Sequence, residues 1–343
     1  MEFNNSVIPH YTCKEIPIDE LKKEVSLNET YLKEKPTWYI VNDKLVYFKK
    51  RSDYRLFTEQ FFTMFAKEII GLNSIDYQVA NIRKIHTAGS IKEPNGSTGL
   101  ISTNFQDKNK YNYYLLSELE DPSISSLVSY GDYCLSNLLT FFDNTLDEKS
   151  FEECKDYLLK LFVADAFMLQ MDRNHHNIGF KTPKIKGLEY TKRLRPEIIS
   201  DTDEAVLENG IYRLKNFTPT PLYDSERILG VDHRNVFLHK PNDIWTPIFP
   251  FTQELLFKTQ EQAKNYQETY CDNMDPNLLE FYLTYSNDVK DLIDRLANGD
   301  EYREILERFK QSNSQILLHP STIEYFETIL KERQNEFKKV LSL

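Results

Sequence analysis

The chain has 343 residues, of which 40% are hydrophobic and 13% aromatic, so it can bury a substantial core and is not a disordered polypeptide. Its formal net charge of −11 argues against a nucleic-acid backbone as the main partner, because phosphate contacts require clustered Lys and Arg. Four widely spaced cysteines indicate neither a zinc site nor a disulfide framework, and no stretch approaches the ~18 apolar residues that span a bilayer, so we expect a cytoplasmic protein that does not bind membranes.

The first predicted elements are a β-hairpin and a helix. Residues 38–48 form two β-rich runs joined by Asn42 and Asp43, which is typical of a hairpin turn. In residues 56–72 (LFTEQFFTMFAKEIIGL) the apolar side chains recur at helical spacing, and Gly71 supplies a stop.

Two further strands are expected before residue 120. The β-rich runs at 77–85 and 111–120 are separated by a predicted loop that contains Pro94, Gly96 and Gly99. The first 120 residues therefore predict a small sheet that carries one helix.

Helical patterns dominate from about residue 124 onward. An apolar helix is predicted at 150–170 (SFEECKDYLLKLFVADAFMLQ). Four charged amphipathic helices are expected after it: 252–271, 277–297, 299–312 and 320–341.

A polar cluster follows the apolar helix, in the stretch MDRNHHNIGF at 171–180. Asp172 and Asn177 lie on a predicted loop before a short apolar run, and loops on a rigid scaffold are where chemistry tends to sit. Downstream, IISDTDEAV places Asp201 and Asp203 after another apolar pair. Phosphotransferases present an acceptor-orienting carboxylate and two Mg²⁺ ligands in a similar order. That order is an Asp, an Asn five residues later, a strand, and then a strand that ends in Asp.

Each of these motifs also has a plain structural interpretation. Asp-x-x-x-x-Asn arises often by chance, and such residues in a loop commonly form turns or helix caps. A zinc site at His175 and His176 is not favoured, because adjacent histidines point in different directions and no third ligand has suitable spacing.

The first third of the chain offers a complementary cation and carboxylate. The hairpin ends in Lys49 and Lys50, and a lysine on such a strand can bridge nucleotide phosphates if a helix carboxylate fixes it. Glu59 lies on the buried stripe of the following helix, whereas Glu68 is nine residues further on and falls about 180° away at ~100° per residue. Glu59 is therefore the expected partner, while strand alternation only weakly separates Lys49 from Lys50.

In their order and spacing these motifs resemble those of the HipA-like serine/threonine kinases of bacteria. The residues that carry the resemblance are VYFKKR, TEQFFTMFAKEIIGL, GLISTNF with Ser102, MDRNHHNIGF and IISDTDEAV. The resemblance implies an α+β, two-lobed, protein-kinase-like fold. Residues 1–120 would form a β-rich nucleotide-clamping N-lobe, and residues 121–343 would form a mostly helical C-lobe.

The resemblance also implies roles for individual residues. Lys49, with Lys50 as the alternative, would contact the phosphates of ATP, and Glu59 would pair with it. Asp172 would be the catalytic carboxylate. The Mg²⁺ ligands would be Asn177 and Asp201, with Asp203 as the alternative acid. The backbone of YYLLSELED would contact adenine near Ser117, Glu118 and Leu119.

Two departures from the family pattern keep alternatives open. The catalytic loop has Asp172-Arg173-Asn174 where the family often has Asp-Arg-His, and no glycine precedes Gly71, so SLNETYL would have to replace a Gly-rich loop over the phosphates. We expect an ATP- and Mg²⁺-dependent kinase for a Ser/Thr hydroxyl of a protein, and kinship implies an antitoxin-type protein partner. The alternatives are a pseudokinase that acts as a binding module and a kinase for a small-molecule or lipid hydroxyl.

Overall fold

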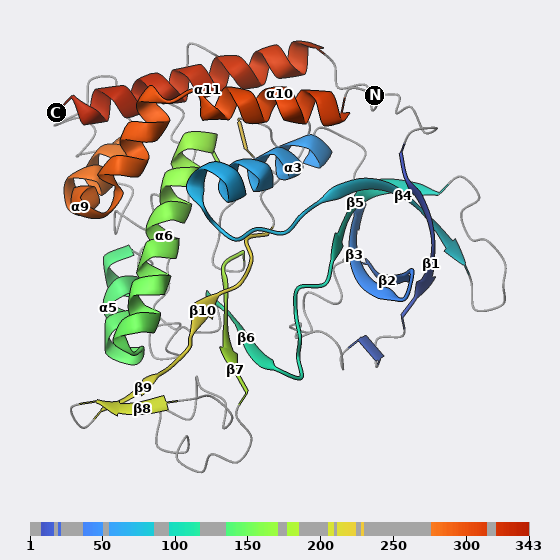
Figure 1. Cartoon of the computed structure of the whole chain (residues 1–343), viewed down its shortest axis with the longest axis horizontal. Coiled ribbons are helices and arrows are strands. Elements are labelled where there is room, and N and C mark those ends of the chain that lie inside the picture. Colours follow the sequence, from blue (N-terminus) through green and yellow to red (C-terminus); the bar gives the residue numbers. More distant parts are fainter. Residues whose placement is uncertain are drawn as a thin grey trace.

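The structure is a computed structural model of the chain. It describes residues 8–16, 20–21, 37–50, 55–85, 96–116, 135–170, 177–184, 205–208, 211–223, 228–229, 276–313 and 320–342. Figure 1 shows a β-barrel at one end of the molecule, helices at the other and a second sheet between them.

Five strands close into the barrel in the order β1-β2-β3-β5-β4. They are β1 (His10–Glu15), β2 (Thr37–Val41), β3 (Lys44–Lys50), β4 (Gln78–Ile85) and β5 (Ser97–Thr103). A parallel pairing of β1 with β4 completes the closure. The buried side chains Tyr39, Phe48 and Ile82 belong to the cluster that fills the barrel.

The predicted hairpin is confirmed as β2 and β3. Asn42 and Asp43 both adopt positive φ, at 49° and 60°, in a two-residue turn between the strands. Positive φ at both central residues gives the turn a twist that matches the right-handed twist of the flanking strands.

The sequence did not predict β1, and it predicted a loop where β5 lies. Gly99 sits inside β5, opposite Lys50 of β3, and a Cβ built on Gly99 would lie 2.3 Å from the backbone oxygen of Lys49. The glycine marks a close approach between two backbones inside a strand, not a turn. β1 carries little pattern of its own, because its apolar Cys13 points into the barrel between the polar residues Thr12 and Lys14.

The helix predicted at 56–72 is confirmed as α3 (Arg55–Phe65), which continues through one wider π-helical turn, η1 (Ala66–Ile70). Gly71 ends it as expected: its φ is 81°, and its N–H caps the carbonyl of Ala66.

A second sheet has the strand order β10-β7-β6. Its members are β6 (Tyr111–Leu115), β7 (Gly179–Pro183) and β10 (Thr218–Pro219), and β8 (Ala205–Glu208) pairs with β9 (Ile211–Leu214) in a separate ribbon. The strand predicted at 111–120 is described only through Leu115, and the predicted lobe boundary at 120 lies outside the described residues.

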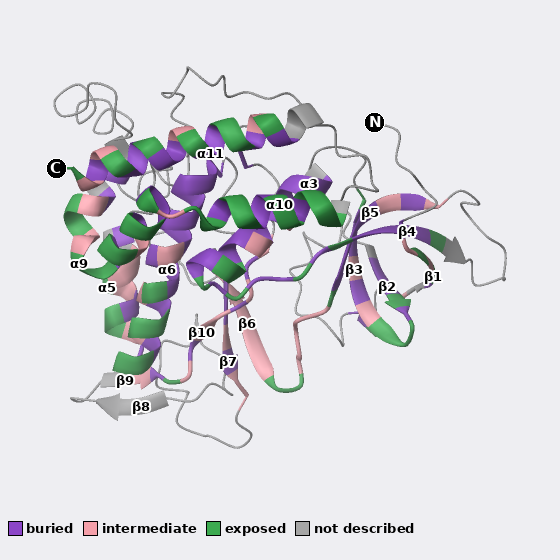
Figure 2. Cartoon of the chain, turned by 45° about the horizontal axis from the view of Figure 1, so that its top comes forward, coloured by how far each residue is buried: buried purple, intermediate pink, exposed green. Residues whose placement is uncertain are grey.

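After α3 and η1, the helices in the described part of the chain are α5 (Leu135–Thr145), α6 (Glu148–Met168), α9 (Pro276–Asn298), α10 (Glu301–Asn313) and α11 (Pro320–Leu341). Their inner faces are buried and their outer faces exposed, as Figure 2 shows. The predictions at 150–170, 277–297, 299–312 and 320–341 are confirmed, whereas 252–271 lies outside the described residues.

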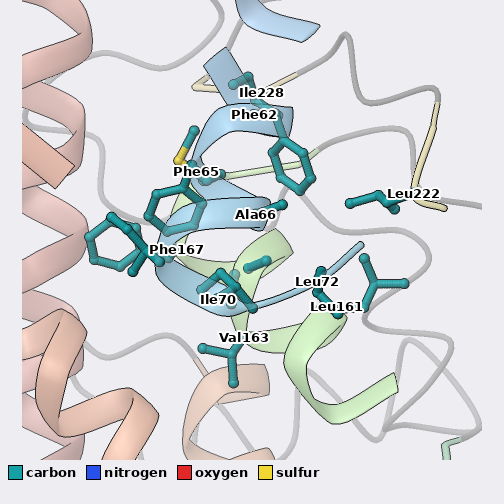
Figure 3. Close-up of a cluster of buried hydrophobic side chains, with 14 of the residues drawn as sticks. Phe62, Phe65, Ala66, Ile70, Leu72, Leu161, Val163, Phe167, Leu222 and Ile228 are labelled. Carbon is teal, nitrogen blue, oxygen red and sulfur yellow. The ribbon is translucent and has the colours of Figure 1, made fainter. Parts of the chain in front are cut away.

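One hydrophobic core joins α3 to the helices that follow. Phe61 of α3 packs on Phe309 of α10 and on Phe326 of α11, with ring centroids 5.2 and 6.0 Å apart. Phe65 and Phe167 of α6 stack in parallel at 5.4 Å, and both rings are seen in the cluster of Figure 3. Among the described residues we find no helix with the length and apolar run needed to cross a membrane.

Candidate active site

The clearest polar feature beside the barrel is a buried ion pair. Lys49 Nζ donates to Glu59 Oε2 at 2.9 Å, which joins strand β3 to helix α3. The Lys49 side chain is 10% exposed and that of Glu59 is fully buried. Phe48, the neighbour of Lys49, points into the barrel core, so alternation along β3 directs Lys49 outward, toward α3.

The two rival residues lie at the surface. Lys50 is exposed, and Glu68 is an exposed residue of η1 that forms an ion pair with Arg308 of α10. Glu59 is thus the partner that the helical angle predicted, and Lys49 is the one of the two lysines that it binds; the role of the pair in nucleotide binding stays a prediction.

A buried ion pair is weak evidence for stability, because removing two charges from water offsets most of their mutual attraction. Hydrophobic residues of similar volume would hold β3 against α3 at least as well. The ion pair therefore fixes where the Lys49 ammonium group lies, and it is not by itself evidence of a more stable fold.

Asn177 directly precedes Ile178 and strand β7, and it is 3% exposed. Its surroundings are fixed on both sides of the strand: Leu116 N–H donates to the Ile178 carbonyl at 2.8 Å, and Thr220 N–H donates to the Gly179 carbonyl at 2.9 Å. Asn177 is thus a buried amide held at the end of the three-stranded sheet, and its side-chain oxygen is of the hard type that Mg²⁺ prefers.

Backbone hydrogen bonds connect the α3 side of the molecule to this sheet. The segment after η1 pairs with the segment after β10: Ile75 N–H donates to the Leu222 carbonyl at 3.0 Å, and Leu222 N–H donates to the Asn73 carbonyl at 2.8 Å. Two residues before Leu222, Thr220 contacts Gly179 beside Asn177. A short hydrogen-bonded path therefore leads from the end of the helix that carries Glu59 to the strand that begins two residues after Asn177.

The chain passes from the barrel to the second sheet between β5 and β6, at residues 104–110. Phe105 in this crossover stacks on Tyr223 at 6.1 Å and meets Tyr113 edge-on at 6.3 Å. Neither Phe105 nor Tyr223 has a role predicted from the sequence, because the crossover can be located only when β5 is known to belong to the barrel.

The remaining predicted site residues lie outside the described residues. They are Asp172, Ser117, Glu118, Leu119, Asp201 and Asp203, together with His175 and His176. The structure thus brings Lys49 and Glu59 together and places Asn177, and the other roles stay predictions.

Comparisons with known proteins bear on the fold. No family model matches the chain, and no curated protein matches it. Among solved structures, the chain is similar to the proinflammatory kinase CtkA of Helicobacter pylori, with a TM-score of 0.54 and 16% sequence identity over 98% of this chain and 99% of that one. It also matches a structure of HipA with HipB and operator DNA from Shewanella oneidensis MR-1, with a TM-score of 0.39 and 12% identity over 96% of this chain and 72% of that one.

The likeness to the Helicobacter kinase extends over the whole length of both chains. It confirms the predicted α+β, protein-kinase-like fold class.

Proposed function

We propose that this chain is a kinase that transfers the γ-phosphoryl group of ATP, with Mg²⁺, to a Ser or Thr hydroxyl of a protein. The observation that carries the proposal is the buried Lys49–Glu59 pair between a barrel strand and the first helix, in a chain with a kinase-like fold. A lysine held in this way presents a fixed positive charge to phosphate oxygens, and positioning with electrostatic stabilisation is most of what phosphoryl transfer requires.

The roles divide among few residues. Lys49 binds the phosphates, and Glu59 holds its ammonium group in place. Asp172 orients the acceptor hydroxyl and accepts its proton as the oxygen attacks the γ-phosphorus. The bond between that phosphorus and the β,γ-bridging oxygen breaks, and ADP leaves. Asn177 holds Mg²⁺ through its side-chain oxygen, and the bound ion would neutralise charge on the phosphates.

The second metal ligand is a carboxylate, and the strand pairing favours a candidate beyond Asp201 and Asp203. In the phosphotransferase order this acid follows the strand that neighbours the one after the Asn. Strand β7 follows Asn177 and pairs antiparallel with both β6 and β10, of which β10 comes later in the sequence. The first acid after β10 in the sequence is Asp224. Asp201 and Asp203 come just before Ala205 in the sequence, and Ala205 pairs with Leu214. The Leu214 carbonyl accepts a hydrogen bond from the N–H of Asp147, at the N-terminal end of α6. That is the end of α6 opposite to the one that leads toward Asp172.

The adenine contact has a second candidate for a similar reason. In a two-lobed kinase the connection between the lobes contacts adenine. Residues 104–107 begin the crossover from the barrel to the second sheet, so their backbone is a candidate beside the predicted Ser117, Glu118 and Leu119.

The test is phosphoryl transfer from ATP and Mg²⁺, followed by mass spectrometry of the chain alone and of the chain with a cell lysate. The variants are Asp172→Ala, Asn177→Ala, Asp201→Ala, Asp203→Ala and Asp224→Ala. We expect the first two and Asp224→Ala to lose transfer, while Asp201→Ala and Asp203→Ala retain it. Phosphoryl transfer that survives in Asp172→Ala and Asn177→Ala overturns the proposal. If Asp201→Ala or Asp203→Ala loses transfer while Asp224→Ala retains it, the carboxylate ligand is Asp201 or Asp203, as first predicted.

One sequence feature favours a second candidate function, a pseudokinase that serves as a binding module. No glycine precedes Gly71, so a Gly-rich loop is absent from the region that would cover the phosphates. A thermal shift separates the two, because a ligand that binds only the folded state stabilises it. A shift with ATP and Mg²⁺ supports the kinase, and the absence of any shift at millimolar nucleotide supports the module. The protein acceptor and an antitoxin-type partner are parts of the same proposal.

A further inference from the structure

The C-terminal end of α6 leads into the segment that contains Asp172, and this end has an unusual conformation. Leu169 adopts the left-handed region, with φ 50° and ψ 54°, and is 2% exposed. Residues with a Cβ avoid this region, and they persist in it only where the surrounding structure imposes it. Contacts around Leu169 therefore decide how the chain leaves the helix.

The carbonyls of the last helical turn are satisfied from three different parts of the chain. Gln170 N–H donates to the Asp165 carbonyl at 2.9 Å, and Leu229 N–H donates to the Met168 carbonyl at 2.8 Å. The Ala166 carbonyl accepts from Arg333 Nε of α11 at 3.0 Å. The final carbonyls of a helix have no donor within the helix, and a cation near them interacts favourably with the helix dipole.

Arg333 reaches this carbonyl from the interior. It is 3% exposed, and it lies 167 residues away from Ala166 in the sequence. A buried guanidinium is costly to desolvate, so its presence on this carbonyl is a specific arrangement and not a surface contact.

The same helix also fixes the neighbouring aromatic ring. Phe337, one turn after Arg333 on α11, meets Phe167 edge-on at 5.2 Å. Phe167 also stacks on Phe65 from the helix that carries Glu59. The contacts of α11 with the end of α6 include the Arg333 hydrogen bond and the Phe337 ring contact, and Phe167 at that end packs against Phe65 of the helix that carries Glu59 (Figure 3).

We propose that Arg333 is a positioning residue that sets the direction in which the chain leaves α6 toward Asp172. This inference rests on the proposed function for its effect on catalysis. Arg333 acts through the α6 backbone, so it governs the placement of the acceptor-orienting carboxylate and leaves the Lys49 side of the nucleotide site intact. Lysine is a poor replacement, because it lacks a planar donor at the Nε position.

The test compares Arg333→Met with Lys331→Met, which removes an exposed cation from the same helix. Transfer kinetics should separate the two steps. For Arg333→Met we expect kcat to fall by about tenfold to a hundredfold while the apparent KM for ATP stays within about twofold. Lys331→Met should match the wild type in both.

A second readout does not depend on activity. Hydrogen exchange is measured on peptides that cover residues 169–177 and, as a reference, the α9 residues 281–297. Arg333→Met should raise exchange in 169–177 by about tenfold and leave the reference unchanged. If the wild type transfers no phosphate, the proposed function has failed, and exchange alone still decides the role of Arg333.

Several results would overturn the inference. The first is that hydrogen exchange in residues 169–177 of Arg333→Met equals that of Lys331→Met. The second is that exchange in Arg333→Met rises equally in residues 169–177 and in the α9 reference, which would show a general loss of stability. In an active enzyme, an unchanged kcat, or a kcat that falls together with ATP affinity, also counts against it. Should Arg333→Met fail to fold, Arg333→Lys replaces it with the same criteria, because it keeps the charge and loses the planar donor.

Discussion

A double-mutant cycle on Lys49 and Glu59 separates the structural role of the ion pair from its functional role. The variants are Lys49→Met, Glu59→Leu and the combination of both. Each single change leaves one charge buried without its partner, whereas the combination replaces the pair with apolar side chains of similar length.

The magnitudes follow from burial. Removing one partner of a buried pair costs about 3–5 kcal/mol in the free energy of unfolding. The Lys49 side chain is 10% exposed, so we expect Glu59→Leu, which leaves the lysine, to lower the free energy of unfolding by about 3 kcal/mol. Lys49→Met should cost more, because it removes the cation that binds the fully buried Glu59 carboxylate. The double variant should recover to within about 1–2 kcal/mol of the wild type, because apolar replacement of a buried pair is often neutral.

The assay is urea unfolding followed by circular dichroism, with ATP binding measured on the same samples. Glu68→Leu is the matched control, because its ion pair with Arg308 is exposed and therefore adds little to stability. We expect the stable double variant to have lost ATP binding. If Glu59→Leu lowers the free energy of unfolding no more than Glu68→Leu does, the structural role of the pair is refuted. If the double variant binds ATP as the wild type does, the role of the pair in nucleotide binding is refuted.

Two further predictions concern stability. Gly99→Ala should lower the free energy of unfolding by about 1–3 kcal/mol, because the added Cβ would lie 2.3 Å from the Lys49 backbone oxygen. Urea unfolding checks this, and an unchanged midpoint would contradict it. Burial raises the pKa of Glu332 to about 7, helped by Glu336 and opposed by Arg333, so the folded state favours the protonated carboxyl and loses stability as pH rises from the ordinary value of 4.5 through about 7. Glu332→Gln should therefore raise the melting temperature at pH 8 and leave it unchanged at pH 4; a difference that is equal at both pH values, or larger at pH 4, would contradict the assignment.

The parts of the fold with strong local signals were predictable. The turn at Asn42 and Asp43 and the helix that ends at Gly71 depend on nearby residues, and the choice of Glu59 over Glu68 needed only the angular spacing of a helix. Gly99 shows the limit: a glycine that permits close backbone approach has the same local signature as a glycine in a loop.

The parts that depend on distant pairing were not predictable. β10 is only Thr218–Pro219, flanked by a further proline, and nothing local marks it as a strand. Its pairing with β7 is the reason that we propose Asp224 as a metal ligand. Arg333 gave no signal either, because its partner is a backbone carbonyl 167 residues away.

The most direct test of the central claim is calorimetric titration with ATP, in Mg²⁺ and in EDTA, of the wild type, Lys49→Met and Asn177→Ala. The two residues are 128 positions apart, and the account requires both to act on a single bound nucleotide. We predict one Mg²⁺-dependent site per chain, weakened by at least about tenfold in each variant, which corresponds to about 1.4 kcal/mol of binding free energy. No binding to the wild type, or Mg²⁺-dependent binding that neither substitution weakens, would contradict the account.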